Sequence, residues 1–116
     1  MKTRYVDLQY LNEISGGKKD LLMEMIEIFN SEVPGYVNLM HGYCNIKNWM
    51  ALGKLCHKAK ASASIMGMKQ LCGELEDLEL LTKEEKDTQL YPSFIRSIEI
   101  QFNNAMEELN QFAKTL

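Results

Sequence analysis

One histidine in this sequence stands among lysines and small side chains, in the segment His57-Lys58-Ala59-Lys60-Ala61-Ser62. A neutral imidazole is a good nucleophile near pH 7, because its ordinary pKa is about 6.5. If the segment is helical, Lys60 lies one turn beyond His57, while Lys58 lies about 100° round the helix axis. The residue types and their spacing therefore suit a nucleophile with an ammonium group one turn away.

An apolar stripe in the same segment predicts which way His57 faces. The stripe recurs at spacings of three and four residues and comprises Trp49, Leu52, Cys56, Ala59, Ala63 and Met66. His57 is one residue off this stripe, so we expect its ring at the solvent edge of the helix. The nearby surface offers little bulk and suits the close approach of another protein, and the predicted partner surface is Met50, Gly53, Lys54, Lys58, Ala61 and Ser64.

The segment from His57 to Ser62, followed by Gly67 and Leu71, resembles the motif of histidine-containing phosphotransfer (HPt) domains. Two positions depart from the family pattern, since Ala59 replaces the usual Leu and Ala61 the usual Gly. Similar residues also fall elsewhere along nearly the whole chain: Asp7, Leu8, Leu11, Ser15, Gly16, Gly17, Asp20, Phe29, Pro34, Leu39 and Trp49.

The resemblance implies a function and a role for each residue of the motif. It implies a phosphorelay intermediate in two-component signal transduction, in which His57 accepts a phosphoryl group from a receiver-domain phospho-aspartate and passes it to another receiver. Lys60 would offset the phosphoryl charge, Lys54 could help from the other side, and Ser62 would hydrogen-bond within the bundle. The expected partners are response-regulator receiver domains and a hybrid sensor kinase. We expect no cofactor on this chain, because Mg²⁺ belongs to the receiver.

Composition limits the alternatives. The 116 residues predict a single domain over 1–116, and a net charge of −3 disfavours nucleic acid as the main ligand. There is no apolar run long enough for a membrane span and no apolar core of a signal peptide near the start, so we expect a cytoplasmic protein. We also expect a monomer. Cys44, Cys56 and Cys72 fit reduced, buried thiols. Without a glycine-rich nucleotide loop, the chain is expected to carry phosphate and not to act as an enzyme on ATP.

The periodicity predicts an all-α fold, an antiparallel up-and-down four-helix bundle with a short extra N-terminal helix. The short helix is expected over 5–14, and 18–43 forms one kinked helix or two, because Pro34 interrupts the pattern. The next helix is expected to be capped by Asn45 and to end near Met66. The last two are expected over 69–81 and from Pro92 onward, joined by a connection over 83–89 without periodicity. The acidic run from Glu74 to Glu79 is interpreted as a solvated helix face.

Two other functions remain open at this point. A metal-binding protein could use His41, Cys44, Cys56 and His57, although adjacent residues on one helix diverge by about 100° and do not easily share a tetrahedral ion. His41 fits a partly buried bundle residue better. The second alternative is an HPt-shaped adaptor or inhibitor without phosphotransfer, which the departures at Ala59 and Ala61 leave possible.

Overall fold

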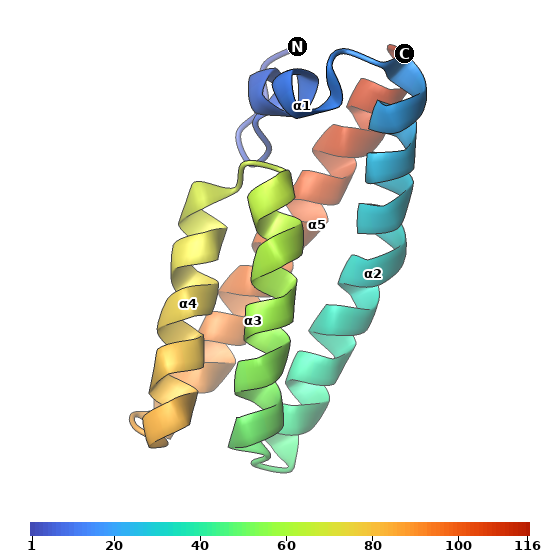
Figure 1. Cartoon of the computed structure of the whole chain (residues 1–116). Helices are drawn as coiled ribbons and strands as arrows, with labels where there is room; N and C mark the ends of the chain where they lie inside the picture. The colour runs from blue at the N-terminus through green and yellow to red at the C-terminus, as the bar shows by residue number, and fades with distance from the viewer.

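The computed structural model describes residues 1–116 and contains five α-helices and one short 3₁₀ helix. These are α1 (Leu8–Ser15), α2 (Lys19–Asn45), α3 (Trp49–Ile65), α4 (Lys69–Glu84), η1 (Thr88–Leu90) and α5 (Tyr91–Ala113). The four long helices run alternately up and down, and α1 lies across one end of the bundle, near both chain termini (Figure 1). Helix α3 packs against α2 and α4, and α5 packs against the same two helices. The predicted all-α bundle with a short N-terminal helix is confirmed.

Helix α1 closes the end of the bundle at which α3 turns into α4. Its N-cap is Asp7, whose carboxylate accepts the backbone N–H of Tyr10 at 3.0 Å. Its C-cap is Gly16, whose φ of +64° is a left-handed conformation that favours glycine. The backbone N–H of Asp7 donates to the carbonyl of Met66 at 3.0 Å, which ties the entry of α1 to the end of α3.

Helix α2 is one continuous helix despite Pro34 in its interior. Proline removes one backbone donor from a helix, so the segment needs compensation from packing. Val33 and Val37 on either side of the proline are buried, whereas Pro34 itself faces solvent. The sequence left open one helix or two. A single helix is correct, because the buried face of α2 continues on both sides of Pro34.

Three predicted helix boundaries are wrong by three residues. Helix α1 begins at Leu8 and not at residue 5, because Asp7 caps it. Asn45 is the last residue of α2, and the N-cap of α3 is Asn48, whose side chain accepts the backbone N–H of Ala51 at 3.2 Å. Lys47, with a φ of +57°, makes the tight link between the helices. Helix α4 continues to Glu84, beyond the predicted end at residue 81, and so includes Lys83.

The core consists of one apolar cluster drawn from all the long helices. Edge-to-face aromatic pairs lie in it, with Phe29 and Phe102 joining α2 to α5 at 5.8 Å between ring centroids. At the edge of the cluster, Trp49 and Tyr91, the first residues of α3 and α5, lie with their ring centroids 5.0 Å apart. His57 has no place in this cluster, so its ring is not required for packing. No helix in the chain combines the length and the apolarity needed to cross a bilayer.

Candidate functional site

His57 lies at the middle of α3 with its ring in solvent. The stripe next to it is buried as predicted, since Leu52, Cys56, Ala59 and Ala63 each expose 0% of their surface. The His57 side chain is 70% exposed. The helix therefore presents the imidazole outward because its neighbour Cys56 takes the inward position.

The imidazole is held on one side by a carboxylate from α4. Both oxygens of Glu79 lie 3.2 Å from Nδ1 of His57. An ionised carboxylate only accepts hydrogen bonds, so Nδ1 carries the proton and donates it. In a neutral imidazole this leaves the lone pair on Nε2, the ring nitrogen on the other side from Glu79. The contact thus selects the tautomer whose outer nitrogen is nucleophilic.

Glu79 corrects the interpretation of 74–79 as a solvated face. Its side chain is only 12% exposed, because it is enclosed between α3 and α4. Glu74 in the same run is also hydrogen-bonded to α5. Its carboxylate accepts from the Ser97 hydroxyl at 2.6 Å and from the Gln101 side-chain amide. The sequence does contain a pattern that indicates this burial. Glu79 follows Leu75 by four residues and so lies on the edge of the α4 apolar stripe.

A hollow of about 550 Å³ opens beside the imidazole between α3 and α4. Its lining combines cations, the Glu79 carboxylate and two apolar side chains: Trp49, Met50, Gly53, Lys54, His57, Glu79, Thr82, Lys83 and Glu85. Two lysines thus share the hollow with the imidazole, one from each helix. Lys83 also lies 3.6 Å from Glu79, measured between Nζ and Oε2, and pairs with it one turn along α4.

The hollow depends on the close approach of the two helices at Gly53. Gly53 was expected on an exposed strip, but it is buried because Thr82 of α4 packs directly against it. A Cβ at this position would lie well under 3.0 Å from Oγ1 of Thr82. That hydroxyl donates to the backbone carbonyl of Glu79 at 2.7 Å, so it belongs to the turn that carries the carboxylate.

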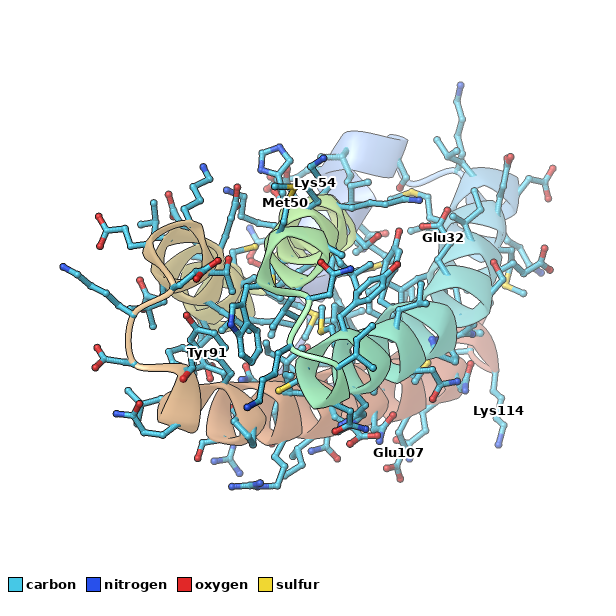
Figure 2. The ribbon with its side chains drawn as sticks, turned by 90° about the horizontal axis from the view of Figure 1, so that it is seen from below. Glu32, Met50, Lys54, Tyr91, Glu107 and Lys114 are labelled. Carbon is cyan, nitrogen blue, oxygen red and sulfur yellow. The ribbon has the colours of Figure 1, made fainter.

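The other residues of the predicted partner surface are exposed: Met50, Lys54, Lys58, Ala61 and Ser64. Met50 is 73% exposed, and Figure 2 shows Met50 and Lys54 projecting from α3 on the side away from α5. Lys58 lies over the ring of Tyr36 on α2, at 6.0 Å from its centroid. Ser62 hydrogen-bonds within the bundle, as predicted, with Oγ 3.4 Å from the Tyr36 hydroxyl.

Lys60, one turn beyond His57 on α3, is half-buried and does not line the hollow. Its backbone carbonyl accepts the thiol of Cys72 on α4, at 3.8 Å from the sulfur. The residue therefore lies on the α4 side of the imidazole, toward the end of the bundle covered by α1. The structure brings His57 together with Lys54 and Lys83 in one hollow, and leaves Lys60 outside its lining.

The cysteines and the second histidine have structural surroundings. All three cysteines are free thiols, and burial, followed by the negative charge of Glu79, raises the pKa of Cys56 to about 12. His41 on α2 lies 3.0 Å from Glu99 on α5, between Nε2 and Oε1, and so joins two helices. The structure holds no group of three or more His, Cys, Asp or Glu side chains arranged to bind a metal ion.

Comparison with known proteins identifies the fold. No protein-family model matches the sequence, and no curated protein sequence matches it significantly. The structure is similar to the crystal structure of histidine-containing phosphotransfer protein B (HptB) from Pseudomonas aeruginosa PAO1, with a TM-score of 0.89. The match covers 99% of each chain at 19% sequence identity. The chain therefore has the fold of a histidine-containing phosphotransfer protein.

Proposed function

We propose that this chain is a phosphorelay carrier that accepts a phosphoryl group on His57 and passes it on. The observation that carries the proposal is the geometry of one side chain: an exposed imidazole whose Nδ1 is held 3.2 Å from a nearly buried carboxylate. The fold shared with HptB and the motif from His57 to Ser62 support the same function. The proposed donor and acceptor are aspartates of receiver domains.

The transfer step follows from the tautomer. The Nε2 lone pair attacks the phosphorus of an aspartyl phosphate, a P–N bond forms, and the P–O bond to the aspartate breaks as the carboxylate leaves. The proton on Nδ1 stays in the hydrogen bond to Glu79, which stabilises the positive charge that develops on the ring. In the reverse direction a second aspartate attacks the phosphorus, and His57 leaves as a neutral imidazole with its Nδ1 proton in place.

The chain needs little more than this nucleophile, because phosphoryl transfer depends mainly on positioning and on charge neutralisation. Lys54 lines the hollow with His57, and Lys60 lies one turn further along α3. We propose that Lys60 offsets charge on the phosphoryl group and that Lys54 contributes from the hollow. Mg²⁺ would be supplied by the receiver domain, so no metal site is required here.

The proposed partner surface surrounds His57 on the outer side of α3. It comprises Met50, Lys54, Lys58, Ala61 and Ser64, with Gly53 forming the floor of the hollow. This surface would place a receiver domain over the imidazole, and the proposed partners are response-regulator receivers and a hybrid sensor kinase. In this role the chain is a monomeric, cytoplasmic carrier and not an ATP-dependent enzyme.

The test mixes the purified chain with receiver domains phosphorylated by a small-molecule donor. The expected product is an acid-labile, alkali-stable phosphate that maps to His57 by mass spectrometry. His57→Gln should fold normally, since the side chain is exposed and outside the core, and it should accept no phosphate. Lys60→Ala should slow transfer or shorten the phosphohistidine lifetime.

Two outcomes would contradict the proposal. Transfer of phosphate to the His57→Gln variant would show that His57 is not the nucleophile. A chain that binds receivers but accepts phosphate from none of them would instead be an HPt-shaped adaptor. Circular dichroism of both proteins controls for folding.

A further inference from the structure

The carboxylate that holds His57 has a second partner. Glu79 lies 3.2 Å from Nδ1 of His57 and 3.6 Å from Nζ of Lys83. Lys83 is one turn beyond Glu79 on α4, and its side chain is 66% exposed at the rim of the hollow. One buried anion is therefore shared between the imidazole and a solvent-facing cation.

Lys83 differs from the other lysine in the hollow. Lys54 lines the same space but has no carboxylate within 4.0 Å, whereas Lys83 already neutralises the group that orients the ring. The charged side chains of the hollow are Lys54 from α3, Glu79 and Lys83 from α4, and Glu85 just after α4. Neither α2 nor α5 contributes a charged group to its lining.

Phosphorylation of His57 would change the charges around Lys83. A phosphoryl group on Nε2 adds a dianion one imidazole ring away from the Glu79 carboxylate, and like charges so close repel each other. A lysine has a flexible stem with three donors, so its ammonium can move between two acceptors at the rim of one hollow.

We propose that Lys83 is an exchangeable counter-ion, which pairs with Glu79 in the unmodified protein and is shared with the phosphoryl group once His57 is phosphorylated. This inference rests on the proposed function, because it concerns the phosphorylated form of the same histidine. It assigns to α4 a cation outside the motif from His57 to Ser62. Lys83 would make the phosphorylated state accessible by offsetting the repulsion between the phosphoryl group and Glu79.

The test loads His57 chemically with phosphoramidate, a small phosphodonor, and follows the ³¹P chemical shift of the phosphohistidine against pH. A nearby ammonium favours the dianion, so its removal raises the midpoint of the phosphoryl titration. For Lys83→Gln we expect an upward shift of about half a pH unit, which is about threefold in proton affinity. The matched control is Lys86→Gln, which removes the same charge nearby from a lysine that pairs with Glu84 at 3.2 Å. It should leave the midpoint unchanged.

A second pair of variants tests the sharing of Lys83. In Glu79→Gln the lysine has only one anion left to neutralise, so adding Lys83→Gln should shift the midpoint further than it does in the natural chain. Non-additivity of this kind is expected when two groups share one partner. Thermal unfolding of each variant shows whether the fold is intact.

The outcomes separate this inference from the proposed function. Equal midpoints for Lys83→Gln and Lys86→Gln, or strictly additive effects of Lys83→Gln and Glu79→Gln, would overturn the role of Lys83. Failure of phosphorylated receivers to modify His57, while phosphoramidate does so, would overturn the relay function alone. If phosphoramidate modifies no histidine, both proposals are wrong, because an exposed nucleophilic imidazole should react.

Discussion

Replacing Gly53 with alanine tests the helix contact on which the site depends. The added Cβ would lie well under 3.0 Å from Oγ1 of Thr82, a position that real Cβ atoms do not occupy. The threonine must then rotate and lose its hydrogen bond to the Glu79 carbonyl, or α3 and α4 must separate. Either change disturbs the turn that holds the carboxylate against His57.

The magnitude follows from two opposing effects. Alanine in place of a mid-helix glycine stabilises a helix by up to about 1 kcal/mol, whereas overpacking a close contact costs about 1–3 kcal/mol. The control is Gly73→Ala on α4, where a Cβ would meet nothing within 4 Å and only the stabilising effect remains. The two variants should therefore differ by about 1–3 kcal/mol, or about 4–12 °C in Tm for a domain of this size.

Thermal unfolding monitored by circular dichroism measures this difference, and Thr82→Ala provides the rescue. Alanine at position 82 has no Oγ1. The nearest atom of that residue to the new Cβ at position 53 is then the Cβ of residue 82, at 3.5 Å, which is an ordinary van der Waals contact. The double variant should therefore lose less stability than the two single variants together. A Tm for Gly53→Ala equal to or above that of Gly73→Ala would refute the reasoning.

Three further predictions concern His57, Cys56 and Gly67. In ¹⁵N NMR spectra the neutral His57 ring should be mainly the Nδ1–H tautomer, and Glu79→Leu should abolish this preference because the acceptor is gone; an unchanged tautomer would contradict it. The pKa of Cys56 is raised from 9.0 to about 12, so above pH 9 the unfolded chain loses a proton that the folded chain keeps. The free energy of unfolding should then fall by about 1.4 kcal/mol per pH unit from this group, and urea titrations of Cys56→Ala should lack that part of the slope. Gly67→Ala should lower Tm more than Gly16→Ala, because both have a positive φ but only at Gly67 would a Cβ meet another residue, Asp7 at 2.6 Å.

Local periodicity predicts well those features that depend on a single helix, such as which of its residues are buried. The α3 stripe was correct, and from it the exposure of His57 followed, since adjacent residues on a helix point about 100° apart. Periodicity alone does not decide whether α2 is one helix or two, because proline weakens local helix propensity and only the packing of the two halves makes them one helix.

Contacts between helices could not be predicted in the same way. Glu79 orients His57 only because α3 and α4 pack in one particular register. That register cannot be predicted from the sequence of either helix alone. The burial of Gly53 against Thr82 has the same origin. The sequence predicts Lys83 in the connection after α4, because the charged last turn of this helix has no apolar residues whose spacing would show where the helix ends. The nucleophile was thus found from its own helix, and its supporting groups only from the fold.

The central claim is that His57 offers Nε2 as the phosphate acceptor while Glu79 holds Nδ1. The most direct measurement is NMR of the ¹⁵N-labelled chain after phosphorylation by a receiver domain, which identifies the ring nitrogen bonded to phosphorus. We expect phosphorus on Nε2 of His57, with the Nδ1 proton still bonded to Glu79. Phosphorus on Nδ1, or on any residue other than His57, would contradict the account.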